Sequence, residues 1–380
     1  MFALTEDHRD LAKAVHDFSA DKIAPYAVMW DRDKFFPVDV LSAAAGLGMG
    51  GIYVGEKFGG SGLRRLDAAL IFEALAEGCP SIASYISIHN MVAWIIDEYG
   101  DEEQRAKWLP DLCTMTTLGS YCLTEPGSGS DAAALTSRAT RDGGDYVLDG
   151  VKQFVSGAGA AEIYIVMART GEKGPRGISA FVVERDTPGL SFGANELKMG
   201  WNAQPTRQVI LESVRVPSGS MLSEEGAGFR IAMNGLNGGR LNIAASSLGG
   251  ASAALKKTLR YMQGRRAFGS SLNQFQALQF ELADMATELE VARTFLWRAA
   301  ASLDSREEGY SVRCAMAKRF VTDAAFDVAN RALQLHGGYG YLAEYGVEKI
   351  VRDLRVHQIL EGTNEVMRMI IARELIGVEL

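Results

Sequence analysis

Near its carboxyl end, the chain reads RVHQILEGTNE over residues 355–365, which places a carboxylate among apolar residues and beside a glycine. Burial by Ile359 and Leu360 would raise the pKa of Glu361 and strengthen it as a base, and the glycine that follows permits backbone angles that other residues avoid. The stretch therefore predicts a catalytic base on a turn. A plain helix N-terminus, capped by Thr363, fits the same residues.

Three more motifs precede this stretch, and the occurrence of all four in this order favours the catalytic interpretation. They read YCLTEPGSGSD over residues 121–131, RRAFG over 265–269 followed by Gln276, and QLHGGYGY over 334–341. On these motifs the chain resembles the acyl-CoA dehydrogenase family along essentially its whole length. Other segments resemble the isobutyryl-CoA branch of that family: YISIHNM at 85–91, GWNAQPTR at 200–207 and GLNGGR at 235–240.

Apolar periodicity predicts helices in the first third of the chain. After Thr5, a plausible N-cap, apolar residues recur with helical spacing at Leu11, Val15 and Phe18. Further helical patterns follow at 38–49, 64–77 and 82–98.

After about Gly119 the pattern changes to short runs rich in valine, isoleucine and phenylalanine. These runs predict strands at 145–148, 153–156, 163–168, 178–183 and 208–211. Asp149-Gly150 is typical of a hairpin turn and is predicted to join the first two strands. Helical patterns return at 229–260, 276–303, 311–335 and 347–374.

These patterns, together with the resemblance, predict an α+β fold like that of the acyl-CoA dehydrogenases. Its parts are an N-terminal α-helical domain (residues 1–119), a middle antiparallel β domain (120–226) and a C-terminal four-helix-bundle domain (227–380). The resemblance implies an enzyme that holds FAD between the middle and C-terminal domains.

Composition argues against several classes of protein. A hydrophobic share of 47% over 380 residues indicates a soluble globular chain that can build more than one core. The formal net charge of −8 argues against a nucleic-acid partner, and no apolar run approaches the roughly 18 residues that indicate a membrane span. The amino terminus has neither a signal core nor a transit-type stretch, so we expect a cytoplasmic protein without membrane insertion.

Cysteine and histidine spacing gives no metal signature. The four cysteines are widely separated, without a Cys-x-x-Cys pair, and the five histidines show no ligand spacing near them. We therefore expect reduced thiols and no metal.

The run GSGSDA at 127–132 also matches the G-x-G-x-x-A fingerprint of dinucleotide-binding Rossmann units. That fingerprint requires a helix directly after it and βαβ alternation around it. Here turn residues and strand patterns arrive within about fifteen positions. We therefore reject a nicotinamide site, although a plain structural loop remains an alternative to the family motif.

The resemblance implies that two segments contact the flavin ring. The stretch 121–130 would lie along the ring, with Thr124 hydrogen-bonding its pyrimidine edge and Ser130 near the thioester end of the substrate. Phe154 would cover the ring and Ser156 would contact N5. These two residues stand where tryptophan and threonine are frequent in the family, which leaves the electronic tuning of the flavin undetermined.

Arg265 offers a cation suited to a pyrophosphate, and the resemblance implies that it reaches a FAD held mainly by a neighbouring subunit. A homotetramer, arranged as a dimer of dimers, follows from the same resemblance. By residue type alone, Arg265 could belong to a solvated basic helix end and His336 could be a packed histidine. The residues expected to bind FAD are Tyr121, Leu123, Thr124, Gly129, Ser130, Phe154, Val155, Ser156, Arg265, Phe268, Phe275, Gln276, Gln334, Leu335, His336, Gly337, Gly338, Thr363, Asn364 and Glu365.

Arg240 matches an arginine that the family carries near its active site, where it would act electrostatically on the base and the substrate. Some branches place the catalytic glutamate directly before this arginine. Here that position is Gly239, so Glu361 is the only candidate base. The residues expected to bind the acyl-CoA are Ser130, Asn237, Gly238, Gly239, Arg240, Leu360, Gly362 and Arg373.

An unactivated thioester holds its α-proton tightly, so removing it needs a desolvated carboxylate and donors aimed at the carbonyl oxygen. The resemblance implies that Glu361 takes the proton, that its backbone N–H and a flavin ribityl hydroxyl bind the oxygen, and that a β-hydride passes to the flavin. Isobutyryl-CoA would become methylacrylyl-CoA in valine catabolism, and electrons would pass to electron-transfer flavoprotein. Leu360, where straight-chain members often carry tyrosine, and the helix at 85–91 would shape a short, wide acyl pocket.

Other functions stay open at this point. Butyryl-CoA and 2-methylbutyryl-CoA are neighbouring substrates. A flavin oxidase or monooxygenase on the same fold is another alternative, and its peroxide yield in air would distinguish it from a dehydrogenase. A catalytically silent scaffold would be indicated by a colourless purified protein.

Overall fold

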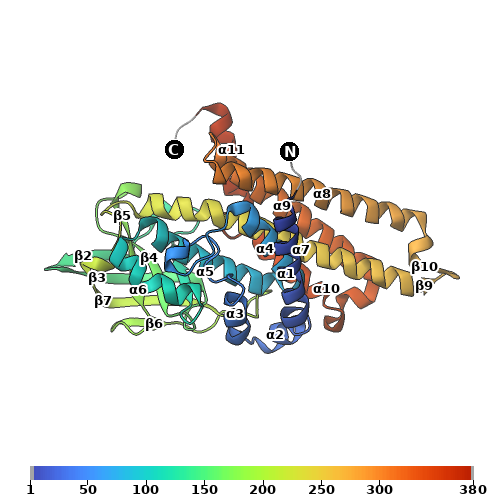
Figure 1. Ribbon diagram of the computed structural model, residues 1–380, viewed down its shortest axis with the longest axis horizontal. Coiled ribbons are helices and arrows are strands. Elements are labelled where there is room, and N and C mark those ends of the chain that lie inside the picture. The colour runs from blue at the N-terminus through green and yellow to red at the C-terminus, as the bar shows by residue number, and fades with distance from the viewer. Residues whose placement is uncertain (1–3, 378–380) are drawn as a thin grey trace.

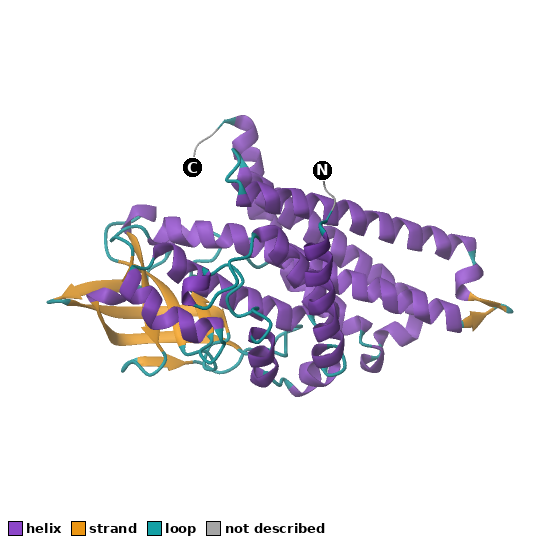
Figure 2. Ribbon diagram, in the orientation of Figure 1, coloured by secondary structure: helices purple, strands orange, loops and turns teal. Residues whose placement is uncertain are grey.

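The computed structural model describes residues 4–377 and contains a helical part, a sheet and a second helical part, as predicted (Figures 1 and 2). Helix α1 begins after Thr5, whose hydroxyl accepts a hydrogen bond from the His8 N–H (3.2 Å), which confirms the predicted N-cap. The buried side of α1 packs against α4. The N-terminal helices are α1 (Glu6–Phe18), α2 (Ala27–Asp33), α3 (Val38–Ala45), α4 (Arg65–Gly78), α5 (Pro80–Tyr99) and α6 (Glu102–Cys113).

The middle part is one sheet with the strand order β6-β7-β3-β2-β4-β5-β8, and β1 pairs with β4. Most neighbours are antiparallel, but β1 and β2 each run parallel to β4. The sheet is therefore mixed where an antiparallel one was expected, because residue alternation reports burial and not strand direction. The strands are β1 (Gly119–Cys122), β2 (Arg138–Asp142), β3 (Asp145–Ser156), β4 (Ile163–Arg169), β5 (Ile178–Glu184), β6 (Leu190–Phe192), β7 (Thr206–Pro217) and β8 (Met221–Leu222).

The hairpin turn predicted at Asp149-Gly150 is wrong. Strand β3 continues through these residues, and the turn lies at Gly143-Gly144, between β2 and β3. At Gly150 the pairing with β7 shifts register, the backbone has φ +148°, and a Cβ would lie 2.3 Å from Ser137 Oγ. Glycine here serves a bulge, and a bulge and a turn share the same local residue preferences.

The C-terminal bundle is built around α7, which is buried along much of its length and packs against α4, α5 and α9. A Cβ at Gly249 would lie 2.1 Å from the carbonyl oxygen of Glu73 in α4, so glycine at this position lets α7 and α4 approach closely. The remaining elements are α7 (Gly228–Gly264), β9 (Arg266–Ala267), β10 (Ser270–Ser271), α8 (Gln276–Asp304), α9 (Tyr310–His336), α10 (Val347–His357) and α11 (Asn364–Ile376).

The helical pattern predicted over 347–374 is in fact two helices. Between α10 and α11, Glu361 and Gly362 take left-handed backbone angles, with φ +58° and +88°, which a right-handed helix cannot accommodate. Thr363 then caps α11 by accepting a hydrogen bond from the Val366 N–H (3.2 Å). Apolar periodicity continues across the break because both helices pack on α9.

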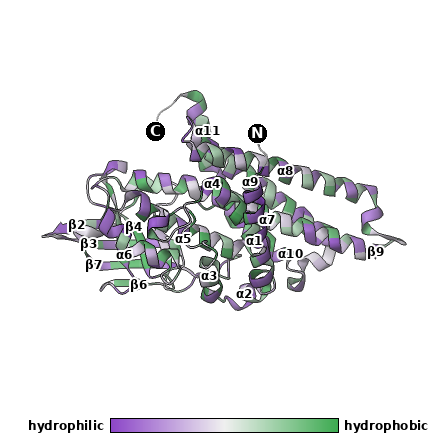
Figure 3. Cartoon of the chain, in the orientation of Figure 1, coloured by the Kyte–Doolittle hydropathy of each residue, from purple (hydrophilic) through white to green (hydrophobic). Residues whose placement is uncertain are grey.

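The sheet lies at one end of the longest axis, and the small β9-β10 hairpin lies at the other (Figures 1 and 2). Hydrophilic residues recur along α8 (Figure 3). None of the described helices is both long and apolar enough to cross a membrane.

Candidate active site

The turn between α10 and α11 holds the Glu361 carboxylate against α7. A Cβ built on Gly239 would lie 2.3 Å from Glu361 Oε2 and 2.7 Å from its Oε1 and Cδ. A side chain at 239 and the carboxylate of Glu361 would therefore occupy the same place. Positions 239 and 361 were the two considered for the base, and a carboxylate from either would reach the same point. In this chain Glu361 provides it.

The environment of Glu361 favours proton transfer near neutral pH. Burial raises the pKa of Glu361 to about 7, although the cations Arg240 and Lys318 oppose the rise. Its Oε2 is buried and accepts no hydrogen bond from the part of the chain that the structure describes. The predicted rise in pKa is confirmed, but Ile359 is 49% exposed, so the burial comes from the α7 side of the turn and not from this neighbour. A carboxylate in this state suits a general base.

Arg240 fixes the backbone of the turn. It is buried, its Nε donates to the Glu361 carbonyl oxygen (3.2 Å), and its Nη1 donates to Asn237 Oδ1 (2.9 Å). Asn237 also accepts a hydrogen bond from Ser311 Oγ of α9 (3.1 Å). Burial lowers the pKa of Arg240, and the charge of Glu361 opposes that fall. The predicted partner of the base thus holds the turn directly and acts on the carboxylate through space.

Lys318 of α9 also contacts the turn, and it is absent from the predicted site. Its side chain is fully buried, and its Nζ donates to the Gly362 carbonyl oxygen and to Asn364 Oδ1, both at 2.9 Å. Burial lowers the pKa of Lys318 to about 7, and the charge of Glu361 opposes the fall. A sequence signal existed, because Lys318 shares an apolar helical stripe with the buried Cys314.

The segments predicted to lie along the flavin ring come together beside the base. The Gln153 N–H donates to the Thr124 carbonyl oxygen (2.8 Å), and Ser120 Oγ donates to the Ser156 carbonyl oxygen (2.7 Å). The Tyr121 hydroxyl is buried and has no hydrogen-bond partner among the described residues. Burial raises the pKa of Tyr121 well above its ordinary value, and the nearby charge of Glu361 adds to the rise.

An unpredicted ion pair supports this group from within the sheet. Lys152 Nζ of β3 lies 2.7 Å from Glu125 Oε1, with both side chains buried, and also donates to the Leu123 carbonyl oxygen (3.2 Å). Backbone N–H groups of Thr136 and Ser137 donate to the same carboxylate. Burial alone would raise the pKa of Glu125, but Lys152 and these donors lower it to about 2. The pair fixes the loop that carries the predicted flavin residues.

Phe154, which is predicted to cover the flavin ring, has an unusual backbone conformation and is exposed. It has a left-handed backbone, with φ +57°, and the residue is 66% exposed. An exposed aromatic held in a strained conformation is consistent with a residue that covers a flat ligand.

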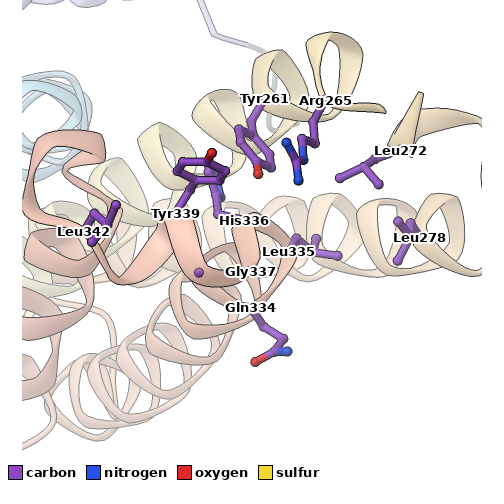
Figure 4. A pocket seen from close by; sticks show the side chains of 11 residues that line it. Tyr261, Arg265, Leu272, Leu278, Gln334, Leu335, His336, Gly337, Tyr339 and Leu342 are labelled. Carbon is purple, nitrogen blue, oxygen red and sulfur yellow. The ribbon is translucent and has the colours of Figure 1, made fainter. Parts of the chain in front are cut away.

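Six of the predicted FAD residues, Arg265 and 334–338, line one pocket at the C-terminal ends of α7 and α9. Arg265 lies 5.5 Å from the centre of the Tyr339 ring, and Tyr261 stacks on His336 at 4.5 Å (Figure 4). Aromatic faces beside a guanidinium suit a base and a phosphate, so the residues fit the adenosine end of FAD. The pocket has a volume of about 510 Å³ and is lined by Tyr261, Arg265, Leu272, Leu278, Gln334, Leu335, His336, Gly337, Gly338, Tyr339 and Leu342.

The pocket of Arg265 and residues 334–338 lies apart from residues 121–130 and 154–156, which are predicted to contact the flavin ring, within one chain. Phe268 is 98% exposed at the tip of the β9-β10 hairpin. The Phe275 ring packs edge to face against it, with 6.4 Å between the ring centres, and Gln276 begins α8. Figure 1 shows this hairpin and the sheet at opposite ends of the molecule.

Three predicted residues of α11 lie in different surroundings. Asn364 is buried, and its amide donates to Thr322 Oγ1 (3.0 Å) and Asp323 Oδ1 (2.7 Å). Glu365 is exposed. Arg373 lies in the last turn of α11, roughly 13 Å along the helix from Asn364, so the structure does not bring it to the base.

Comparison with known proteins identifies the chain. Residues 5–116, 120–214 and 226–376 match the N-terminal, middle and C-terminal domains of acyl-CoA dehydrogenase. The chain belongs to the acyl-CoA dehydrogenase family. It is 55% identical over 373 residues to the mitochondrial isobutyryl-CoA dehydrogenase of Dictyostelium discoideum, which covers 98% of this chain and 90% of that protein.

Solved acyl-CoA dehydrogenase structures share the fold. Butyryl-CoA dehydrogenase from Megasphaera elsdenii superposes with a TM-score of 0.96 at 40% identity, over 99% of this chain and 100% of that one. A chain from a structure described as the electron transferring flavoprotein of Acidaminococcus fermentans superposes with a TM-score of 0.96 at 38% identity, over 99% of both chains.

Membership in the acyl-CoA dehydrogenase family confirms the predicted fold class and makes the chain an oxidoreductase of a flavoprotein family. The GSGSDA run leads into a single turn of 3-10 helix, Ala132–Ala134, and then into β2, so it does not open a Rossmann unit. Within residues 4–377, no three His, Cys, Asp or Glu side chains gather in a way that could hold a metal ion.

Proposed function

We propose that this enzyme dehydrogenates a short branched-chain acyl-CoA at its α and β carbons, converting isobutyryl-CoA to methylacrylyl-CoA. The observation that carries the proposal is the single carboxylate, Glu361, held against Gly239 with an unoccupied oxygen and a pKa near neutrality. Similarity to the isobutyryl-CoA dehydrogenases of Dictyostelium discoideum and Bos taurus supports the acyl group.

In this proposal Glu361 removes the α-proton as the β-hydride leaves, and a carbon–carbon double bond forms between the two positions. The backbone N–H of Glu361 makes no backbone hydrogen bond within the described residues, so it is free to donate to the thioester oxygen, where enolate charge develops. Arg240 and Lys318 favour the ionised form of the base. Bound FAD supplies the acceptor for the hydride.

The α5 side of the site supports a short acyl group. Ile95 Cδ1 and Met91 Cγ would lie 3.2 and 3.5 Å from a Cβ on Gly235, one turn of α7 before Gly239. These buried side chains crowd α7 close to the base. Together with Leu360, they would leave room for a branched four-carbon acyl group more readily than for a long chain.

We infer that each FAD is shared between two subunits. The ring would lie beside Glu361, on residues 121–130 and 154–156, and the adenosine end would lie in the pocket of Arg265 and residues 334–338 of a neighbouring subunit. The separation of these groups in one chain and the 98% exposure of Phe268 support this arrangement. We propose a homotetramer, built as a dimer of dimers, as the assembly.

The electron acceptor we propose is an electron-transfer flavoprotein. Support comes from the similar chain in the structure described as the electron transferring flavoprotein of Acidaminococcus fermentans. The pathway we propose is valine breakdown, because isobutyryl-CoA would be the substrate.

The test is an anaerobic titration of the purified yellow protein with isobutyryl-CoA, followed by flavin absorbance. Stoichiometric bleaching would support the proposal. If butyryl-CoA or 2-methylbutyryl-CoA bleached the flavin faster, that compound would take the place of isobutyryl-CoA as the proposed substrate. A yellow protein that no short acyl-CoA bleaches would refute the dehydrogenase activity. Substrate-dependent peroxide in air would indicate an oxidase instead.

A further inference from the structure

The turn that carries Glu361 is attached to α9 by two charged residues, Lys318 and Asp323. The Lys318 Nζ donates to the Gly362 carbonyl oxygen (2.9 Å), directly after the base. Asp323 Oδ1 accepts from Gln358 Nε2 (2.8 Å), at the start of the turn. The turn is therefore held before and after Glu361 by side chains of a single helix.

Asn364 joins the two attachments. Its Oδ1 accepts from Lys318 Nζ (2.9 Å), and its Nδ2 donates to Asp323 Oδ1 (2.7 Å) and to Thr322 Oγ1 (3.0 Å). Every polar atom of this amide is thereby used inside the protein. We call Lys318, Thr322, Asp323, Gln358 and Asn364 the α9 clamp.

The clamp contains an amine, Lys318, whose charged form is costly to bury. The Lys318 side chain is fully buried, and no carboxylate of the described chain lies within salt-bridge distance of it. Burying a charge without an ion-pair partner is unfavourable unless its hydrogen bonds have a specific use. Here both acceptors belong to the turn and to the first residue of α11.

We propose that Lys318 is a positioning residue for the reaction, which holds Glu361 in its left-handed conformation over Gly239 and presents a positive charge behind it. This inference rests on the proposed role of Glu361 as the base. Without the Lys318 donor, the Gly362 carbonyl would lose its hydrogen bond. Arg240, which donates to the Glu361 carbonyl, would then hold the unfavourable left-handed angle at Glu361 less firmly.

The charge of Lys318 also affects the titration of the base. The groups that face it are Glu361 and Glu365 across the turn, Arg240 from α7, Asp323 from its own helix and His357 from α10. Because Lys318 opposes the rise in the pKa of Glu361 that burial causes, removing it should move that pKa upward. The rising limb of the rate–pH profile would then shift to higher pH.

The test compares Lys318→Met with Lys349→Met in the flavin-loaded protein. Lys349 is also buried, and its Nζ donates to Asp353 (2.6 Å) and contacts Cys79 Sγ (3.2 Å) without reaching the turn. The measurements are amide hydrogen exchange of the peptide covering 357–366, the rate constant of flavin reduction across pH, and the melting temperature. The acyl-CoA is the one that bleaches the wild-type flavin fastest.

We expect the amide hydrogens over 357–366 to exchange faster in Lys318→Met than in the wild type. Its flavin should be reduced about 10- to 100-fold more slowly, since a misplacement of ~1 Å can cost about that much. The rising limb of its rate–pH profile should lie at higher pH. Lys349→Met should lower only the melting temperature. Wild-type exchange in Lys318→Met, or faster exchange with an unchanged rate and pH profile, would overturn the proposal. If Lys318→Met does not fold, Lys318→Gln takes its place, with the same outcomes decisive. The exchange result needs no substrate, so it tests the clamp even if no acyl-CoA bleaches the flavin.

Discussion

Replacing Gly239 with alanine should displace the base without unfolding the protein. The new Cβ would lie 2.3 Å from Glu361 Oε2, whereas ordinary contact begins near 3.4 Å, so the carboxylate must move by roughly 1 Å. A misplacement of that size can lower the rate about 100-fold. The three nearest atoms all belong to the end of the Glu361 side chain, and alanine favours a helix interior over glycine by up to about 1 kcal/mol. Stability should therefore stay the same or rise while activity falls.

The assay is stopped-flow flavin reduction by isobutyryl-CoA, together with the melting temperature. Gly264→Ala is the matched control, because it makes the same change in the same helix and its Cβ would have no neighbour within 4 Å among residues 4–377. It should keep the wild-type rate. A Gly239→Ala enzyme that reduces its flavin within threefold of the wild-type rate would refute the claim that the Glu361 carboxylate occupies this place.

Three further changes test other parts of the account. Glu125→Gln would leave Lys152 as an unpaired buried charge and should destabilise the protein by about 3–5 kcal/mol, measured by urea unfolding, with loss of flavin. Arg265→Ala should weaken FAD retention roughly tenfold, since a charged hydrogen bond contributes about 1.5–3 kcal/mol, measured as flavin content after dialysis; full retention would contradict the shared site. Leu360→Tyr should reduce activity on isobutyryl-CoA more than on butyryl-CoA, and an equal loss of kcat/KM for both would refute its role in the acyl pocket.

Stability should also respond to pH through the base. The pKa of Glu361 is raised from 4.5 to about 7 by burial, so the folded state binds its proton more tightly than the unfolded state does. This contribution to stability is present below pH 4.5 and is lost as pH rises through about 7, a change of at most about 3 kcal/mol. Glu361→Gln should accordingly raise the melting temperature at pH 8 more than at pH 4.5. A larger gain at the lower pH would contradict the raised pKa.

The sequence was most informative where one residue type has one physical use. Thr5 begins a helix because its hydroxyl can satisfy a free N–H, and apolar spacing marks the buried faces of the long helices. The candidate base could also be predicted, because the order of the four motifs favoured a catalytic carboxylate over a plain helix N-terminus. Its pKa is raised as expected, but by packing against α7, which lies more than a hundred residues earlier in the chain.

What could not be predicted depends on contacts between distant segments. The bulge at Gly150 is decided by β7, which lies about sixty residues onward, and the residue itself fits a turn equally well. Lys152 looks like a solvated charge until the sheet encloses it. The helical spacing of Lys318 and Cys314 indicates a buried face, but it does not reveal the contact between Lys318 and the turn. The separation of the predicted FAD residues into two distant groups was implied by the family resemblance, through Arg265 and a neighbouring subunit, and no local motif encodes it.

The most direct test of the central claim is anaerobic flavin reduction by isobutyryl-CoA in wild-type and Glu361→Gln protein across pH. We expect the wild-type rate constant to rise with pH through about 7, as the base ionises. The folded, yellow Glu361→Gln protein should lack this rise and should be slower than the wild type by about 1,000-fold above pH 7. Fast flavin reduction by Glu361→Gln would contradict the assignment of Glu361 as the base.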